Sequence, residues 1–361
     1  MMCARCGHDS TYPQRSGGVC PGCRKHFAFE PRTGDPVADM GWKSAIEWVS
    51  SHGTVRFTED HLHHAIARRV KRKSAAAVVG ILGGVFGVVF VGVGISGGSA
   101  GVGIFGVFVM LGAVIGATAS KMMAPIGLAM TRGEFDTLFA RWCAAHGKPK
   151  DLIAPRAASR PLTAEMKREL ANYSFDRAVI CDRPETVDVL LGNDFHFENN
   201  CAVLTAGGYP DHAAPLIRTM LAQNPRLEVF VLHDATVEGC VLAHELRHSP
   251  EWFGGKDVRV FDVALRPAQA KAHTALHWNL PRDVGSHPAI TPDEARWLSA
   301  RSMRLAAFSP EQIIKRLFRA MQHLPELADA AGADSSSGST SDVILWNTDA
   351  TTSDGGADSF G

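Results

Sequence analysis

Four cysteines near the N-terminus have the spacing of a metal site. Cys3 and Cys6 form one C-x2-C pair, and Cys20 and Cys23 form a second. Two residues between thiolates let each pair curl around one side of an ion, and two such pairs complete the closed tetrahedral arrangement of structural zinc. The pattern therefore predicts one zinc ion held by all four cysteines.

The residues around these cysteines favour the same chemistry. Gly7 and Gly22 stand where tight turns need a residue without a Cβ. A segment of about thirty residues has too small a core to fold alone, so the metal is expected to supply most of its folding free energy. Residues 1–33 resemble a zinc ribbon, with His8 and His26 expected at the surface. Disulfide pairing is the alternative, and the absence of a secretory signal before the cysteines disfavours it.

A second metal-binding pattern lies far along the chain, where residues 244–248 match H-E-x-x-H. On a helix, positions i and i+4 place both imidazoles on one face, and the glutamate can activate a metal-bound water. One hypothesis is therefore a zinc peptidase site with His244 and His248 as ligands and Glu245 as the catalytic base. The alternative is a crossover helix that carries these side chains in solvent. The candidates for a third ligand are Glu251, Asp257 and His273.

A third candidate site depends on a predicted parallel sheet. Short apolar strands alternate with helices, and this alternation specifies parallel strands joined by right-handed crossovers. In such sheets, function collects at the carboxyl ends of the strands. The predicted strands are 177–181, 201–205, 229–232 and 258–262, and the predicted helices are 184–192, 211–223 and 238–248.

The residues that follow these strands have a recognisable order. Asp182 ends the first strand, Gly207-Gly208 follows the second, and the loop Asp234-Ala-Thr-Val-Glu-Gly239 follows the third. An acid, a glycine turn and an Asp-x-Asp-x-x-Gly-like loop resemble a toprim domain over residues 176–273. The stretch Val263-Ala-Leu-Arg-Pro-Ala-Gln-Ala is also similar to the A subunit of type IIB topoisomerases.

The resemblance implies a Mg²⁺ site for phosphoryl transfer, with Asp182 and Asp234 as the candidate catalytic acids. This chain departs from the family pattern, because Asp182 replaces a Glu and Thr236 stands where a second Asp belongs. Glu238 or Glu185 could compensate, but a missing carboxylate weakens a Mg²⁺ site. No tyrosine-bearing winged-helix domain is evident. We therefore expect a degenerate domain that binds a ligand, a protein partner, a nucleotide or nucleic acid.

An uncharged, glycine-rich stretch precedes the predicted sheet. Residues 74–119 contain no Asp, Glu, Lys, Arg or His, and one bilayer crossing needs about 20 apolar residues. The pattern predicts two transmembrane helices, 75–96 and 102–122, in a hairpin spanning 74–122. Glycine-rich faces allow close helix packing, so homo-oligomerisation is a further expectation. The alternative is a glycine-rich hairpin in a globular core.

Basic residues beside the hairpin predict its orientation. The run 68–73 precedes the first span, and Lys121 and Arg132 follow the second. Lys and Arg next to a span tend to stay in the cytoplasm. The expected protein is thus multi-pass, with its N- and C-terminal domains in the cytoplasm.

Length and composition fit a multidomain globular protein. The 361 residues include 37 basic and 37 acidic side chains, so a surface built wholly for nucleic acid is excluded. A hydrophobic share of 45% with 8 cysteines excludes collagen-like, fully disordered and disulfide-scaffold classes. The expected units are a zinc ribbon (1–33), a short helical linker domain (34–73), a transmembrane hairpin (74–122), an amphipathic helix and linker (123–161), a toprim-like α/β domain (162–290), C-terminal helices (291–325) and a disordered acidic tail (326–361).

The sequence as a whole predicts a membrane-anchored cytoplasmic scaffold or regulatory protein with structural zinc. The alternative is an enzyme, either a Mg²⁺-dependent nuclease that uses Asp182 and Asp234 or a zinc metallopeptidase of the H-E-x-x-H type. One further segment, Phe195-His196-Phe197, precedes the second strand. Its two aromatic rings could stack on a base or close the lower edge of the sheet.

Overall fold

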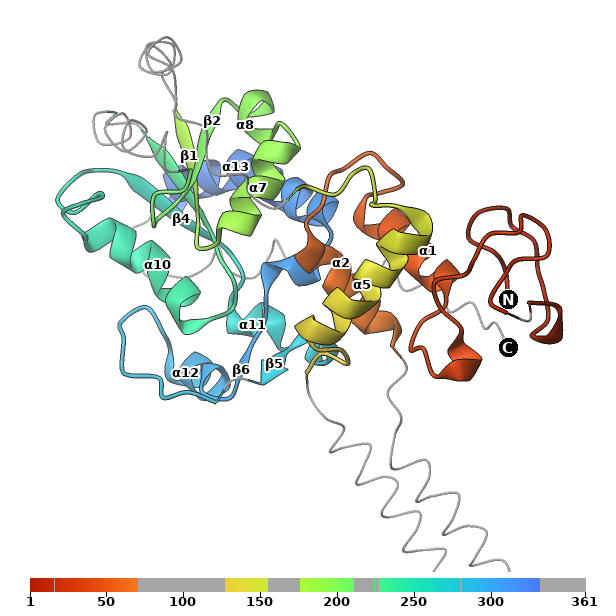
Figure 1. Ribbon diagram of the computed structural model, residues 1–361. Helices are drawn as coiled ribbons and strands as arrows, with labels where there is room; N and C mark the ends of the chain where they lie inside the picture. The colour runs from red at the N-terminus through yellow and green to blue at the C-terminus, as the bar shows by residue number, and fades with distance from the viewer. Residues whose placement is uncertain are drawn as a thin grey trace, which may run out of the picture.

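The computed structural model describes residues 1–15, 17–70, 127–154, 176–210, 224, 227–279 and 281–331. These residues form an N-terminal cysteine unit (residues 1–33), a three-helix unit and an α/β domain. Figure 1 shows the three-helix unit between the other two, so it is the part that contacts both.

The cysteine unit consists mainly of turns. Two isolated antiparallel bridges, Met2 with Asp9 and Val19 with His26, close its two hairpins. The buried Arg15 side chain donates to Glu30 Oε2 at 2.6 Å and fixes the loop between them. The short 3-10 helices of this unit are η1 (Pro13–Arg15) and η2 (Pro31–Thr33).

The three-helix unit packs around stacked aromatic rings. The ring of Trp42 lies 5.3 Å from that of Phe29 and 5.8 Å from that of Phe135, measured between centroids. All three side chains are buried, so the cysteine unit contributes Phe29 to the core of the helices. The helices are α1 (Asp39–Val49), α2 (Glu59–Arg69) and α5 (Arg132–His146).

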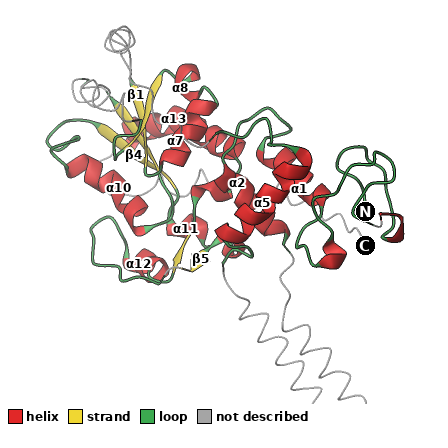
Figure 2. Cartoon of the chain, viewed as in Figure 1, coloured by secondary structure: helices red, strands yellow, loops and turns green. Residues whose placement is uncertain are grey.

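A four-stranded parallel sheet in the order β2-β1-β3-β4 forms the centre of the α/β domain. Its strands are drawn in yellow in Figure 2. Strand β1 pairs with β2 on one side and with β3 on the other, so the direction of winding reverses there. Open α/β sheets bind ligands at such a switch point, outside the carboxyl ends of the strands. The strands are β1 (Arg177–Cys181), β2 (Cys201–Thr205), β3 (Glu228–Leu232) and β4 (Arg259–Ala264).

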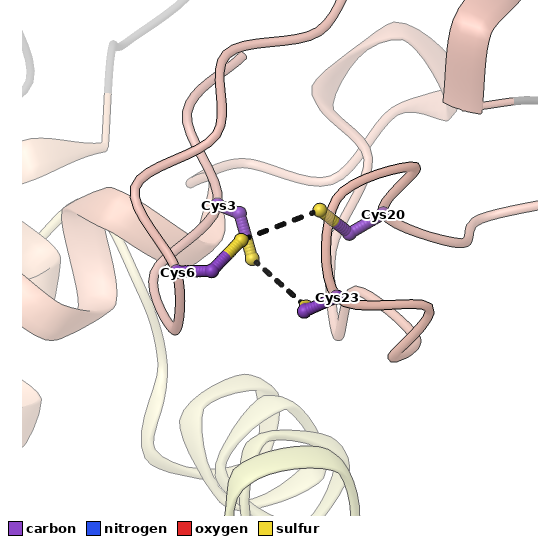
Figure 3. Close-up of side chains that lie close together, drawn as sticks. All are labelled: Cys3, Cys6, Cys20 and Cys23. Atoms are coloured by element: carbon purple, nitrogen blue, oxygen red, sulfur yellow. Dashed lines mark hydrogen bonds between the residues drawn. The ribbon is translucent and has the colours of Figure 1, made fainter.

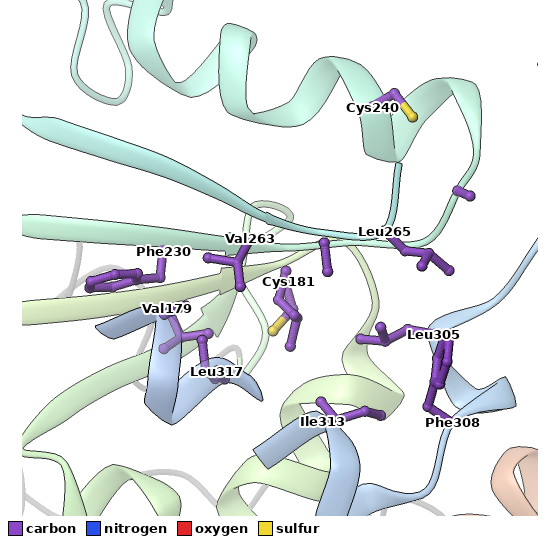
Figure 4. Close-up of a cluster of buried hydrophobic side chains, with 14 of the residues drawn as sticks. Val179, Cys181, Phe230, Cys240, Val263, Leu265, Leu305, Phe308, Ile313 and Leu317 are labelled. Carbon is purple, nitrogen blue, oxygen red and sulfur yellow. The ribbon is translucent and has the colours of Figure 1, made fainter. Parts of the chain in front are cut away.

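Helices cover both faces of this sheet. Val179 of β1 points to one face, where it shares a buried cluster with Leu317 of α13 (Figure 4). Its neighbour Ile180 points to the other face and packs with Leu246 of α10, as the alternation of side chains along a strand requires. The helices are α7 (Pro184–Gly192) and α13 (Pro310–Ala331) on the first face and α10 (Val237–His248) on the second.

The segment after α10 returns to the strand ends. Strands β5 and β6 pair as an antiparallel ribbon, and then Met303 exchanges two backbone hydrogen bonds with Ala235, at 2.9 and 3.2 Å. This pairing brings Leu305 next to the turn after β3. The remaining elements are α8 (Phe195–Glu198), α11 (Pro267–Ala270), η3 (Thr274–Leu276), β5 (Trp278–Asn279), α12 (Pro292–Leu298), β6 (Arg301–Ser302) and η4 (Leu305–Ala307).

The predicted membrane anchor has to be corrected. No helix in the described part of the chain is both long enough and apolar enough to cross a membrane. Helix α13 has the length, at 22 residues, but it carries Glu311, Lys315 and Arg319, and such charges are costly in a hydrocarbon core. The transmembrane hairpin, the multi-pass membrane location and the membrane as a partner are therefore withdrawn. The predicted spans 75–96 and 102–122 themselves lie outside the described residues.

The strands agree with their predicted ranges to within two residues at each end. Helix α5 is the predicted amphipathic helix after residue 131, and α13 continues to Ala331, beyond the predicted limit of the C-terminal helices. The predicted helix 211–223 and residues 332–361 of the predicted acidic tail lie outside the described residues.

Candidate functional site

The four N-terminal cysteines converge on one point. Cys3 Sγ lies 3.8 Å from Cys23 Sγ, and Cys6 Sγ lies 3.7 Å from Cys20 Sγ (Figure 3). The four sulfur atoms all lie within 4.8 Å of one another, and all four thiols are free. Among the described residues, no other group of three or more histidines, cysteines or acids brings its ligand atoms this close. These cysteines could therefore hold a metal ion.

Each C-x2-C pair lies on a tight turn. The Cys3 N–H donates to the His8 carbonyl at 2.9 Å, and Cys20 makes the corresponding bond in the second turn. The residue after each pair has a positive φ, 72° at Gly7 and 55° at Arg24. Glycine thus occupies the left-handed position in the first turn, as predicted, while the second turn places an arginine there.

Gly22 is needed for a different reason from the one predicted. A Cβ atom at this position would lie 2.9 Å from His8 Cβ, which is closer than real Cβ contacts come. The two turns therefore approach each other at Gly22, and a side chain there would separate the two cysteine pairs.

The pKa values of two of these thiols, Cys20 and Cys6, are shifted in opposite directions. Hydrogen bonds from the backbone N–H groups of Cys23 and Gly22 lower the pKa of the Cys20 thiol to about 7. A backbone hydrogen bond from His8 also lowers the pKa of Cys6, but burial and the other thiols outweigh it, and the net pKa is raised to about 11. A thiolate is the form that binds a metal, so a divalent cation would displace the remaining protons.

A buried carboxylate and a histidine join the cysteine unit to the helices. Asp39 accepts the N–H groups of Ala28 and Phe29 at 3.1 and 2.9 Å, and its Oδ2 lies 2.7 Å from His146 Nε2. Arg5, between the cysteines of the first pair, donates to His146 Nδ1 at 3.3 Å. The first cysteine turn thus contacts helix α5 through the side chains of Arg5 and His146.

The two acids predicted at the strand ends do lie together at the switch point. Asp182 follows β1 directly, and its Oδ2 accepts the N–H of Asp234 at 2.8 Å. The other oxygen, Oδ1, is buried and has no hydrogen-bond partner. Burial raises the pKa of Asp182 above its usual value.

Asp234 is already engaged by the chain itself. Its side chain is 3% exposed, and Oδ1 accepts the N–H of Leu305 at 2.7 Å. Its Oδ2 lies 3.7 Å from Arg183 Nε. Burial and the charge of Asp182 raise the pKa of Asp234 to about 7. At neutral pH this carboxyl group is therefore partly protonated and offers few free lone pairs.

Arg183 occupies the space in front of the acids. Its Nε lies 3.4 Å from Glu185 Oε2 as well as 3.7 Å from Asp234 Oδ2. The cavity that remains has a volume of about 10 Å³, which is room for about one water molecule. We call its charged and histidine lining the strand-end cluster, which consists of Asp60, His61, Arg183, Glu185, Asp234 and Arg304.

Asp60 of α2 connects the three-helix unit with this cluster through two ion pairs. One of its oxygens lies 2.7 Å from Arg304 Nη1 of the α/β domain, and the other lies 2.5 Å from Arg132 Nη1 of α5. The sequence analysis missed these residues, because an acid in the first turn of a helix and isolated arginines carry no motif. Arg183 had a usable signal, since it directly follows a predicted metal-binding acid.

The loop after β3 builds a helix and supplies no additional ligand. Thr236 Oγ1 accepts the N–H of Gly239 at 3.0 Å and caps α10. Glu238, a candidate compensating acid, has a side chain that is 65% exposed and pairs with Arg282 at 2.7 Å. A Cβ atom at Gly239 would lie 2.3 Å from the carbonyl oxygen of Asp234, so only glycine fits there.

A second internal cation lies behind the acids. His233 is fully buried, with Nδ1 2.7 Å from the Asp234 carbonyl oxygen and Nε2 2.9 Å from Asp262 Oδ1. A carbonyl and a carboxylate only accept, so His233 donates from both nitrogens as an imidazolium. Burial lowers its pKa, but the Asp262 carboxylate outweighs burial and the net pKa of His233 is raised. This positive charge also favours the ionised form of Asp182.

The H-E-x-x-H residues lie on the last two turns of α10. The rings of His244 and His248 stack with centroids 4.0 Å apart and an angle of 24°. His248 Nδ1 lies 2.8 Å from the His244 carbonyl oxygen, an acceptor, so this nitrogen carries the proton.

Of the three candidate third ligands, one lines the same groove as these histidines and two do not. Glu251 lines the same surface groove as His244, Glu245 and His248, whereas Asp257 and His273 do not. His287, which sequence analysis did not consider, has its ring 5.0 Å from that of His244. In the part of the chain that the structure describes, these side chains do not bring three ligand atoms to metal-binding separation.

The aromatic segment before β2 serves two roles. Phe195 is 1% exposed and belongs to the core of the sheet, whereas Phe197 is 71% exposed. The His196 ring lies beside Phe197, with centroids 4.1 Å apart. Phe195 is thus a buried plug, and Phe197 presents an aromatic surface to solvent.

Comparison with protein-family models, with curated proteins and with solved structures found no match to this chain. Neither a family nor a relative therefore supports the resemblance to toprim domains. The structure shows the coarser features, a parallel sheet with acids at its switch point and a cluster of four cysteines.

Proposed function

We propose that this protein is a scaffold or regulatory protein without catalytic activity. In it, a structural zinc site and the three-helix unit are held against a degenerate, toprim-like α/β domain. The position of Arg183 carries this proposal, because one guanidinium nitrogen lies within 4 Å of both Asp234 and Glu185. The strand-end acids are thus neutralised from inside the chain.

The space at the strand ends supports the same interpretation. Mg²⁺ demands near-octahedral oxygen ligands at about 2.0–2.1 Å and usually keeps several waters and a substrate phosphate. A cavity of about 10 Å³ accommodates neither. In addition, Asp60 of α2 lines this cavity and pairs with Arg304, so a substrate would first have to displace α2.

The cysteine cluster supports a structural metal. Four thiols complete the coordination of a zinc ion and leave no open position for substrate or water, as in structural zinc sites. Zinc at this point would hold the two turns together and keep Arg5 beside His146 of α5. Its contribution would be to the stability and position of residues 1–33.

A scaffold needs a surface for its partner, and Phe197 is the candidate. It is the most exposed of the large apolar side chains in the described residues, at 71%. Exposed aromatic rings anchor protein interfaces and stack on the bases of single-stranded nucleic acid. The partner would accordingly be a protein or a nucleic acid bound at the surface, away from the strand-end cluster.

Thermal unfolding of the zinc-loaded full chain with and without Mg²⁺ tests this function. A scaffold should show no Mg²⁺-dependent rise in melting temperature and no hydrolysis of single- or double-stranded DNA or RNA. Binding of Mg²⁺ to the folded state would raise the melting temperature by linkage. A rise or a nuclease activity that disappears in Asp234→Asn would overturn the proposal in favour of phosphoryl transfer.

A further inference from the structure

We infer that Arg183 is a built-in cation that takes the place of a metal ion at the strand ends, and that removing its charge creates a divalent-cation site there. The inference deepens the proposed function and rests on it, since the metal implied by the toprim-like order of residues does not fit the residues present. The inference names Arg183 as the residue that excludes a metal ion, and divalent cations as the class of ligand that is excluded.

The geometry around Arg183 is that of a bridging ion. A single atom, Nε, lies 3.7 Å from Asp234 Oδ2 and 3.4 Å from Glu185 Oε2. Neither the Glu185 oxygen nor the neighbouring Asp182 Oδ1 has a hydrogen-bond partner, although both atoms are buried. Asp234 and Glu185 therefore face one positive group, and Asp182, which accepts the Asp234 N–H, adds a buried oxygen without a hydrogen-bond partner on the residue before Arg183.

The other nearby cations are committed elsewhere. His233 pairs with Asp262 at 2.9 Å, and Arg304 pairs with Asp60 at 2.7 Å. Arg183 is thus the cation that pairs with Glu185 and Asp234, and it acts together with His233 on the charge of Asp182. It also lowers the pKa of Asp182 and of Asp234, against the burial that raises both.

The chemistry of the site selects the class of ion. Carboxylate oxygens suit hard cations such as Mg²⁺ and Mn²⁺ and are poor ligands for softer ones. Loss of the guanidinium would enlarge the present one-water cavity by the volume of the removed group. His61 lines this cavity, is 3% exposed, and has a buried Nε2 without a hydrogen-bond partner. It could bind the ion or one of its waters.

Arg183→Met is the decisive variant, because methionine keeps the apolar stem and removes the charge. Mn²⁺ is the probe, and loss of the free-ion electron paramagnetic resonance signal measures its binding to zinc-loaded full chain. Measurement at about pH 8 lies above the pKa of about 7 that Asp234 has in the wild type, and a bound cation displaces any proton that remains on this carboxyl group. We expect one Mn²⁺ per chain in Arg183→Met, bound at least about tenfold more tightly than by the wild type.

Three controls sharpen this result. Arg183→Lys retains a tethered cation and should resemble the wild type. Arg177→Met removes an arginine at the opposite end of β1, where it pairs with Glu228 at 3.3 Å, and should not gain a site. The double variant Arg183→Met, Asp234→Asn should lose the Mn²⁺ gained by the single variant.

Arg183→Gln is measured in parallel in case Arg183→Met folds poorly, with zinc content and circular dichroism as the folding criteria. Absence of Mn²⁺ binding in the folded Arg183 variants would overturn the inference and leave the proposed scaffold function intact. Detectable Mn²⁺ binding of equal strength by the wild type and Arg183→Met would overturn both the inference and the proposed function, because the strand ends would then hold metal with Arg183 in place.

Discussion

The cysteine cluster and the strand-end cluster contain potential metal ligands in comparable number, yet their surroundings differ. The four thiols lie within 4.8 Å of one another, and they contact each other and backbone N–H groups. At the strand ends, the Asp234 oxygens instead face the Leu305 N–H and Arg183. The cysteine cluster is arranged to receive a cation, whereas the strand-end cluster already contains the guanidinium of Arg183.

This difference shows that ligand type and spacing are insufficient evidence for a metal site. Acids gather at the end of β1 and β3 because the sheet brings their strands together, but arginines lie there as well. Arg183 directly follows Asp182, and Arg304 comes from a distant segment of the chain. A metal site can be recognised only when the counter-charges around its ligands are also known.

Zinc removal should have the largest effect on stability, and it tests the cysteine half of this comparison. Apparent binding free energies in small zinc domains are about 10 kcal/mol or more, so Cys20→Ser should lose the metal and unfold residues 1–33. Limited proteolysis and zinc content would measure this. Cys143→Ser, outside the cluster, is the matched control and should retain one zinc. Zinc retention by Cys20→Ser would contradict the four-cysteine site.

Asp60→Ala should have the next largest effect and tests whether the strand-end charges are structural. It leaves Arg132 and Arg304 without their carboxylate partner. Breaking a buried pair costs about 3–5 kcal/mol, and partial exposure of both arginines reduces this to about 2–3 kcal/mol of unfolding free energy. Urea unfolding of Asp60→Ala and of the exposed control Asp293→Ala would measure the difference. Equal stability of the two variants would show that the pair does not hold the units together.

Asp234→Asn should change how the unfolding free energy depends on pH more than it changes the unfolding free energy at neutral pH. The folded pKa of Asp234, about 7, lies above its usual value, so its contribution to stability is fully present at acidic pH. That contribution is lost as pH rises from about 4 to about 7, because only the unfolded state releases the proton freely. Asn cannot titrate, and its stability should decline less over this range.

Urea unfolding at several pH values would measure this change, with Asp293→Asn as an exposed control. The stability of Asp234→Asn relative to the wild type should increase between about pH 4 and 7 and then stay level. A constant difference across this range would show that Asp234 has an ordinary pKa.

The double variant His244→Ala, His248→Ala should have the smallest effect and tests the remaining metal-like pattern. Surface substitutions usually change stability by about 0.5 kcal/mol or less, and zinc should stay at one per chain. Metal analysis of the purified variant would measure it. A fall from two zinc ions to one would instead establish the H-E-x-x-H site.

Local patterns in the sequence predicted much of the fold. The ranges of β1 and α7 match their predictions, because continuous apolar runs and an initial proline mark them directly. The spacing of the cysteines also predicted their convergence. The same kind of pattern predicted a membrane hairpin at 74–122, which the described helices do not support.

Contacts between distant segments could not be predicted in this way. Asp60 meets Arg304 across 244 positions, and Asp234 meets the N–H of Leu305 across 71. No local periodicity records which charge will approach which, because that depends on how whole units dock. The strand-end acids were therefore predicted correctly in position, while the groups that occupy them were not.

Native mass spectrometry of the full chain, after exposure to excess Zn²⁺ and Mn²⁺ together, tests the contrast between the two clusters most directly. One zinc and no manganese per chain is the predicted result, since the thiols lack a cation and Arg183 already supplies one to the acids. A chain that carries manganese lost in Asp234→Asn, or one that carries no zinc, would contradict this account.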